Sequence, residues 1–454
     1  MSDQVFHCPW LLSADGWLQD GLLTVGTDGS IVAIGSGDIP PGVIRLPGPV
    51  IPGMCNVHSH AHQRLIAGLT GKSGASRDSF WSWREQMYAA IALLTSADLE
   101  LLASWLYMEM LEGGYTSIGE FHYPHRLAGC DPYQTSQALL DAAARAGCAL
   151  TLLPVWYRYS DFGRAPANDQ QQPFVLDETA FADLVARLNG STSGSALIRI
   201  GMAPHSLRAV DVADLAGLAA EIPDVPIHIH IAEQPAEVEA CVGHSGQPPI
   251  TLLAGQVELD QRWCLIHATH ATDEEIRLMA DSGVVVGLCP TTEADLGDGL
   301  FPARQLLDYG GRLAIGSDSN LCTSAATELR LLEWGQRLQL HQRNVLVPGE
   351  GGHLGRYLWQ HAAAAGAQAL AQPAGALSPG LRADFIVLNG DHPLLSGLVP
   401  DAQLDTLIMA EQAGMISEVY VSGQQQVSGG QHPGRPVLAG RIAELRQRLS
   451  DRTQ

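Results

Sequence analysis

The chain has 454 residues, with 26 lysines and arginines against 48 aspartates and glutamates, so its formal net charge is −22. This acidity argues against nucleic-acid binding, which needs a basic surface, and a hydrophobic content of 46% against 16% charged residues argues against a disordered chain. No apolar stretch reaches the ~18 residues of a membrane span, and the N-terminus has no signal-peptide pattern. The eight cysteines form no C-x-x-C pair, so we expect reduced core thiols in a cytoplasmic protein.

Short β-like runs occupy both ends of the chain. Residues 22–25 and 31–34 flank a turn and predict a hairpin, and residues 383–388 and 418–423 predict two strands near the C-terminus. Between these ends, helical stretches alternate with eight apolar strand-like runs, at 55–60, 116–122, 149–155, 198–205, 227–232, 263–270, 284–289 and 313–318. This alternation predicts an α/β fold, a closed TIM-like (β/α)8 barrel. The alternative is an open doubly wound sheet, but no glycine-rich phosphate loop follows the first strand.

Residues of metal-ligand type stand at the ends of six predicted strands. The active site of such a barrel lies at the C-terminal ends of its strands, and a group of imidazoles there is hard to explain by core packing, because each would need a polar partner. The residues concerned are His58, His60, His122, His205, His230, His267, His270 and Asp318.

Four of these residues could hold one ion. His58 and His60 are weak evidence by themselves, but residues i and i+2 of a strand point to the same side and can reach one ion. His230 stands near the end of the fifth strand, and we expect His228 to be an interior residue one layer deeper. Asp318 ends the eighth strand and would complete a set that suits zinc or another borderline divalent ion. Alternatively, Asp318 caps the helix that follows it.

Two further groups could move protons beside such an ion. Glu233 follows the fifth strand, where a carboxyl group at a water-poor rim could carry a raised pKa. Alternatively, it is an exposed carboxylate at the start of a helix. His267 ends the sixth strand. The alternation of side chains along the strand and the depth in the barrel favour His267 over His270 as the catalytic group, and we expect His270 to be structural.

This set of histidines, with Glu233 and Asp318, resembles the amidohydrolase superfamily. The segments 50–53 and 380–384 are typical of that superfamily, and the resemblance covers essentially the whole chain. It implies a small composite β-sandwich domain formed by residues 1–52 and 373–435, a metal-dependent barrel at 53–372 and a C-terminal helix at 436–454.

The only lysine, Lys72, bears on how many metal ions the chain would hold. Binuclear members of the superfamily usually bridge two metals with a carboxylated lysine at the end of the fourth strand, and here that strand ends at His205. We therefore expect one divalent ion per chain, with Zn²⁺ as the first choice and Fe²⁺ and Mn²⁺ as alternatives that the ligand types also fit. Its expected ligands are His58, His60, His230 and Asp318.

Members of the superfamily with this mononuclear pattern are mostly deaminases of compounds that contain C=N bonds. By this resemblance His267 and Asp318 accept or orient the proton of the attacking water, and Glu233 carries a proton to the departing nitrogen. Substrate-binding residues are expected on the loops that leave the strands: Gln63, Arg84, Tyr123, His205 and Arg208. Two arginines suit carboxylates, because a guanidinium group binds them bidentately. Alternatively, Arg84 lies on a helix surface and Arg208 forms a helix-start salt bridge.

A closer resemblance is to the formimidoylglutamate deiminases, bacterial enzymes of histidine breakdown. The segments 56–64, 78–84, 120–123, 205–210 and 291–299 carry it, with His62 as a departure, since an aromatic residue is typical there. It implies hydrolysis of N-formimidoyl-L-glutamate, a small substrate with two carboxylates, to N-formyl-L-glutamate and ammonia. It also implies a homodimer, in which Arg84 acts in its own or the neighbouring subunit. The alternatives are a related deaminase of a purine, pterin or triazine, and an inactive binding protein, against which the intact ligand set argues.

Overall fold

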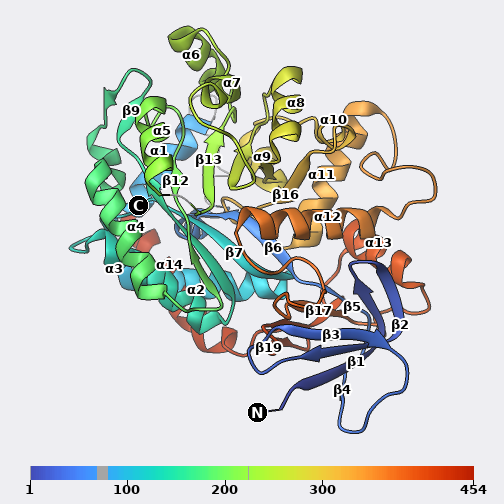
Figure 1. Cartoon of the computed structure of the whole chain (residues 1–454). Helices are drawn as coiled ribbons and strands as arrows, with labels where there is room; N and C mark the ends of the chain where they lie inside the picture. Colours follow the sequence, from blue (N-terminus) through green and yellow to red (C-terminus); the bar gives the residue numbers. More distant parts are fainter. Residues whose placement is uncertain (1, 69–79, 223, 454) are drawn as a thin grey trace.

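The computed structural model of the chain describes residues 2–68, 80–222 and 224–453, without the side chains of 80–85 and 449–453. Figure 1 shows a large barrel surrounded by helices, with a smaller sheet beside it that contains the N-terminal strands. Within the described residues, no helix is long and apolar enough to cross a membrane.

The larger sheet is a ring of parallel strands. Its order is β11-β8-β7-β6-β16-β15-β14-β13, with β12 on β8, and a parallel bridge between Met202 and Ile227 joins its two ends. All eight predicted strands are present, and the fourth is split into β11 and β12, so the (β/α)8 barrel is confirmed. The strands are β6 (Met54–Ser59), β7 (Tyr115–His122), β8 (Ala149–Trp156), β11 (Ile198–Ile200), β12 (Ala203–Pro204), β13 (Ile227–Ile231), β14 (Trp263–His267), β15 (Val285–Leu288) and β16 (Arg312–Ile315).

Helices alternate with the barrel strands and surround them (Figure 1). Capping boxes begin two of them, because the side chains of Thr95 and Thr272 accept the N–H of the third helical residue in α2 and α8. The alanine-rich helix α12 packs closely against β6, since a Cβ added to Gly366 would lie only 2.7 Å from the Cβ of Cys55. The helices of this part are η1 (Ala61–Ile66), α1 (Phe80–Ile91), α2 (Ser96–Glu112), α3 (Pro132–Ala146), η2 (Asp169–Phe174), α4 (Glu178–Thr192), α5 (Val212–Glu221), α6 (Pro235–Ser245), α7 (Pro249–Ala254), α8 (Asp273–Ser282), α9 (Pro290–Leu296), α10 (Ala303–Asp308), α11 (Ala325–Leu340) and α12 (Leu354–Ala369).

The smaller sheet combines both ends of the chain. Its order is β19-β18-β17-β5-β1-β2-β3, with β4 on β1. The predicted hairpin is the antiparallel pair β2 and β3, and β17 joins the two ends by pairing with both β5 and β18. The division into domains at residues 52, 372 and 435 stays a prediction. The strands are β1 (Gln4–Ser13), β2 (Gly16–Val25), β3 (Ile31–Ser36), β4 (Ile44–Arg45), β5 (Val50–Pro52), β17 (Phe385–Leu388), β18 (Ile416–Val421) and β19 (Gln424–Ser428).

The remaining elements are a short hairpin after β8, formed by β9 (Tyr159–Asp161) and β10 (Ala165–Pro166), and the helices α13 (Pro400–Ala410) and α14 (Arg435–Thr453). A buried ion pair links the smaller sheet to the barrel, since Arg382 binds Asp384 and also donates to the Ser117 hydroxyl of β7 at 2.7 Å. All eight cysteines are free, and six of them are buried, as expected of core thiols, whereas Cys130 and Cys322 are only partly buried.

Candidate active site

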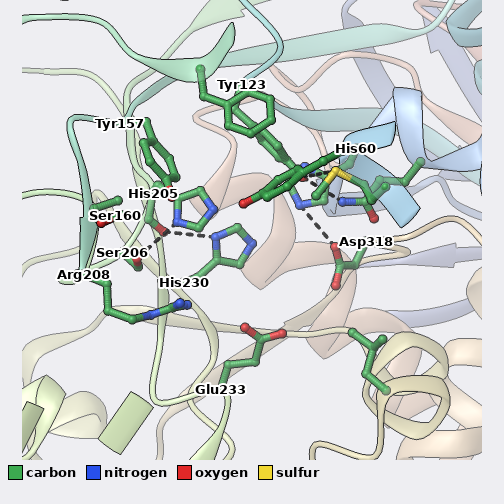
Figure 2. Close-up of a pocket in the computed structure, with 16 residues that line it drawn as sticks. His60, Tyr123, Tyr157, Ser160, His205, Ser206, Arg208, His230, Glu233 and Asp318 are labelled. Atoms are coloured by element: carbon green, nitrogen blue, oxygen red, sulfur yellow. Dashed lines mark hydrogen bonds and ion pairs between the residues drawn. The ribbon is translucent and has the colours of Figure 1, made fainter. Parts of the chain in front are cut away.

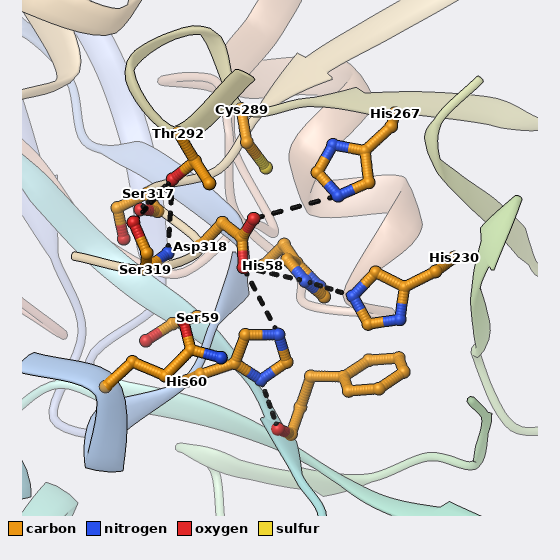
Figure 3. Close-up of polar contacts among 12 residues, drawn as sticks. His58, Ser59, His60, His230, His267, Cys289, Thr292, Ser317, Asp318 and Ser319 are labelled. Carbon is orange, nitrogen blue, oxygen red and sulfur yellow. Dashed lines mark hydrogen bonds and ion pairs between the residues drawn. The ribbon is translucent and has the colours of Figure 1, made fainter. Parts of the chain in front are cut away.

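The four predicted metal ligands meet at the C-terminal ends of β6, β13 and β16 (Figure 3). The Nε2 atoms of His58 and His230 lie 2.9 Å apart. The Oδ1 atom of Asp318 lies 3.5 Å from Nε2 of His58 and 3.2 Å from Nε2 of His60. All four side chains are buried, and one ligand atom from each lies within 4.8 Å of the others. The barrel therefore brings together residues that are up to 260 positions apart in the sequence.

The hydrogen bonds around this cluster determine where the imidazole protons lie. The Nδ1 atom of His60 is 2.8 Å from the carbonyl oxygen of Phe121, and Nδ1 of His230 is 3.0 Å from that of His205. A carbonyl oxygen only accepts, so each Nδ1 carries the proton and each Nε2 presents a lone pair. The lone pair of His60 faces a carboxylate oxygen of Asp318, so an acceptor faces an acceptor, and the lone pair of His230 faces Nε2 of His58. A divalent cation between them resolves this arrangement, and three imidazoles with one carboxylate suit zinc.

Burial and then the neighbouring His60 lower the pKa of His58 to about 3. The imidazole of His58 is therefore neutral near pH 7, as a metal ligand must be. Asp318 adopts a φ of 42°, in the left-handed region that residues with a Cβ rarely occupy. Two backbone hydrogen bonds hold it there, from its own N–H to His58 and from the N–H of His60 to its carbonyl oxygen. The N-cap of the following helix α11 is Ser324, so the alternative role of Asp318 as that cap is wrong.

His267 lies beside the cluster at the end of β14. Its Nε2 is 3.7 Å from Oε1 of Glu233 and 3.7 Å from Oδ2 of Asp318. On the other side of the ring, Nδ1 is 3.2 Å from Oε1 of Glu293, an oxygen that also accepts the N–H of Cys289 at 2.8 Å. Burial lowers the pKa of His267, but Glu233, the hydrogen bond to Glu293 and Asp318 together outweigh it and raise this pKa to about 10.

Glu233 is buried, with 5% of its surface exposed, so the alternative of an exposed carboxylate is wrong. Burial raises its pKa to about 7; His267 opposes this rise and Asp318 adds to it. The sequence prediction of a raised pKa at this position therefore agrees with the structure. Glu293 was not predicted as a site residue. It lies in the segment 291–299, but only the fold places the first turn of α9 against β14.

A pocket opens beside the ligand cluster (Figure 2). Four of the five predicted substrate-binding residues line it, and Gln63 donates to the Tyr123 hydroxyl at 3.0 Å. The fifth, Arg84, lies in α1 outside the described side chains. Tyr157 and Phe174 also line the pocket and were missed, because no motif marks the residue after β8 or the end of the short helix η2. The lining includes His60, Gln63, Tyr123, Tyr157, Phe174, His205, Arg208, His230, Glu233 and Asp318.

Three other histidines, on the barrel strands or just beyond them, have structural partners. Nε2 of His228 lies 2.8 Å from the carbonyl oxygen of Ala369, as expected for an interior residue. Nε2 of His270 lies 2.9 Å from that of Asp298, and Nε2 of His122 contacts the Thr135 hydroxyl at 3.2 Å. These three residues are not among the four clustered ligands. Lys72 lies outside the described residues.

Comparisons with known proteins agree with this geometry. The chain matches the amidohydrolase family over residues 50–425. It is 44% identical over 445 residues to formimidoylglutamate deiminase of Pseudomonas aeruginosa, covering 97% of this chain and 98% of that protein. The crystal structure of an amidohydrolase from Brucella melitensis aligns with a TM-score of 0.93 and 40% identity, over 98% of this chain and 99% of that one. A zinc-bound adenosine deaminase from Xanthomonas campestris has the same fold, with a TM-score of 0.82 and 21% identity over 99% of each chain.

Proposed function

Because the chain belongs to the amidohydrolase family, we propose that it is a hydrolase of C–N bonds in linear amidines, which converts N-formimidoyl-L-glutamate and water to N-formyl-L-glutamate and ammonia in histidine degradation. The observation that carries this proposal is the pocket, in which Arg208 shares one space with Glu233, His60 and Asp318 (Figure 2). The similarity to the deiminase of Pseudomonas aeruginosa supports it.

The proposed substrate has an amidine at one end and two carboxylates at the other, and the pocket offers a partner for each. Arg208 can bind a carboxylate bidentately, which a nucleobase would not require. The amide of Gln63, the hydroxyl of Tyr123 and the imidazole of His205 line the same pocket and supply further polar contacts. We propose Arg84 as a second carboxylate ligand, on the sequence resemblance alone.

The metal would be held by His58, His60, His230 and Asp318, one ion per chain. Zn²⁺ is our first choice, and Fe²⁺ or Mn²⁺ also fits a set of three imidazoles and a carboxylate. When bound, the ion supplies a water molecule whose pKa is lowered toward neutrality. The carbonyl oxygens on Nδ1 of His60 and His230 keep both rings in the orientation that this ligation needs.

We propose that Asp318 and the neutral form of His267 take the proton of the attacking water, since Oδ2 and Nε2 lie 3.7 Å apart. The charge of a cation held by the cluster would oppose the carboxylates that raise the pKa of His267 and so favour this neutral form. Glu233 can then protonate the amidine nitrogen, which leaves as ammonia from a tetrahedral carbon. With a pKa of about 7, its carboxyl group is present in both protonation states near neutral pH. Its Oε1 lies 3.7 Å from Nε2 of His267, so a proton taken by one group can reach the other.

We further propose a cytoplasmic homodimer. Size-exclusion chromatography with light scattering at micromolar concentration tests the dimer, and a single monomer peak would contradict it.

The reaction itself is tested by product analysis in ¹⁸O-labelled water. Metal-loaded protein should convert N-formimidoyl-L-glutamate to N-formyl-L-glutamate that carries one ¹⁸O atom on the formyl group, with one equivalent of ammonia. Formation of free glutamate and formamide would mean that the other C–N bond breaks, and the proposed deimination would be wrong.

A further inference from the structure

A second set of ligand atoms lies next to the catalytic cluster. His267, Cys289 and Asp318 are all buried, and Nε2, Sγ and a carboxylate oxygen of these three residues lie within 4.8 Å of one another. Figure 3 shows the sulfur of Cys289 directed toward the space between the other two side chains. Asp318 serves both sets, because its Oδ1 faces His58 and His60 whereas its Oδ2 faces His267.

The His267 ring is already oriented for ligation. Glu293 accepts from Nδ1, so this nitrogen keeps its proton, and Nε2, which lies 3.7 Å from a carboxylate oxygen of Glu233 and of Asp318, is the atom that presents a lone pair once a cation displaces its own proton. Among the described residues, no hydrogen-bond partner satisfies that Nε2, although it is fully buried. A histidine whose far nitrogen is held by a carboxylate is the common arrangement around protein-bound metals.

The donor types specify the class of ion. A thiolate with an imidazole and a carboxylate suits soft or borderline cations such as Cd²⁺ and Zn²⁺, not Mg²⁺ or Ca²⁺. Tetrahedral zinc with bonds of 2.0 to 2.3 Å holds neighbouring donor atoms about 3.5 Å apart. The His267 to Asp318 distance of 3.7 Å is close to this value, and the sulfur of Cys289 lies within 4.8 Å of both ligand atoms.

We propose that His267, Cys289 and Asp318 form a second, inhibitory metal site, which takes one soft or borderline divalent cation when that cation is in excess. On binding, the S–H bond of Cys289 and the Nε2–H bond of the His267 imidazolium break, a sulfur–metal and a nitrogen–metal bond form, and both protons leave to solvent, with no change of oxidation state. The ion occupies Nε2 of His267 and Oδ2 of Asp318, so neither can accept a proton from water. The inhibition, unlike the binding, rests on the proposed function.

This site differs from a bridged binuclear centre. It uses no lysine, and the bridging group is the carboxylate of Asp318. The catalytic ion is still expected alone in protein loaded with one equivalent of zinc, and the second site fills only when further metal is added.

The test is a cadmium titration of the holoenzyme that holds one zinc ion per chain, followed by equilibrium dialysis, ultraviolet absorption and ammonia release. One further Cd²⁺ should bind, with a thiolate-to-cadmium charge-transfer band and loss of activity in parallel. In Cys289→Ala the band should be absent and the affinity for this Cd²⁺ should fall at least ~10-fold. Cd²⁺ that displaces zinc from the first site gives no such band, because no cysteine lies among those four ligands.

Cys322→Ala is the matched control, since this thiol is free and only partly buried, and should keep the band. If Cys289→Ala does not fold, His267→Asn must lose the second Cd²⁺ instead. A band that persists without Cys289, or its absence in the wild type, would overturn the site. Full activity with the band fully developed would overturn the inhibition. If the wild type releases no ammonia, the proposed function is wrong. The charge-transfer band still tests the second metal site in that case.

Discussion

Acid should destabilise this protein through histidines that must be neutral in the folded state, and the partly buried His361 of α12 allows the effect to be measured. Its Nε2 accepts the backbone N–H of Leu313 in β16 at 3.2 Å, so the ring must be neutral there. Burial, and then the nearby Arg312, lower the pKa of His361 from 6.5 to about 4. Because the folded pKa lies below the unfolded one, this contribution to stability is present above pH 6.5 and is lost as the pH falls toward 4. The full effect corresponds to about 3 kcal/mol, of which about 2 kcal/mol is lost between about pH 7.5 and about pH 5.

The informative change is His361→Gln. The amide oxygen of glutamine can still accept the N–H of Leu313, but the side chain cannot be protonated. Urea unfolding of both proteins, followed by tryptophan fluorescence at the two pH values, gives the change in the free energy of unfolding. The variant should lose about 2 kcal/mol less than the wild type over this pH interval. Other buried groups and any bound metal affect both proteins alike, so an equal loss in the two proteins would refute the reasoning.

Four further predictions concern the site. Glu233→Gln should lower kcat by ~10² to 10⁴ with little change in KM, because it removes the proton donor; steady-state kinetics with an unchanged kcat would exclude this role. Arg208→Met should raise KM for N-formimidoyl-L-glutamate at least ~10-fold and leave kcat nearly unchanged, and a fall in kcat alone would point away from carboxylate binding. Glu293→Ala should lower kcat ~10 to 100-fold, whereas Glu293→Gln, whose amide oxygen still accepts from His267, should restore most of it; equal losses in both variants would contradict a positioning role. Dialysis against a chelator should abolish ammonia release, and one equivalent of Zn²⁺ should restore it; activity in protein shown by metal analysis to be metal-free would contradict the ligand assignment.

The barrel could be predicted from the sequence because each strand is a separate apolar run, and because chemistry-bearing residues stand at the ends of these runs. Because residues i and i+2 of a strand point to the same side, the sequence predicted His58 and His60 on one side of the first strand and His228 one layer below His230. The structure agrees in each case. The split of the fourth strand was not visible, because its apolar run continues through Gly201. A Cβ at that glycine would lie 2.7 Å from the carbonyl oxygen of Pro226, so the chain passes too close to its neighbour for any other residue.

The residues that the sequence missed act through contacts between distant elements. Glu293 reaches His267 only because α9 turns back over the end of β14, and no spacing within a single element indicates that direction. Cys289 reads as an ordinary core thiol in an apolar strand, yet its sulfur lies within 4.8 Å of ligand atoms of His267 and Asp318. Such neighbours depend on how strands are ordered around the barrel, which the pattern of apolar residues does not specify.

The measurement that tests the central claim most directly is ammonia release from N-formimidoyl-L-glutamate by protein loaded with one zinc ion, with adenine, guanine and cytosine assayed beside it under the same conditions. The site described here predicts rapid release from the diacid and none from the bases, because Arg208 shares the pocket with the metal ligands. Release from a base, with none from the diacid, would leave the metal site in place and contradict the assignment of the pocket.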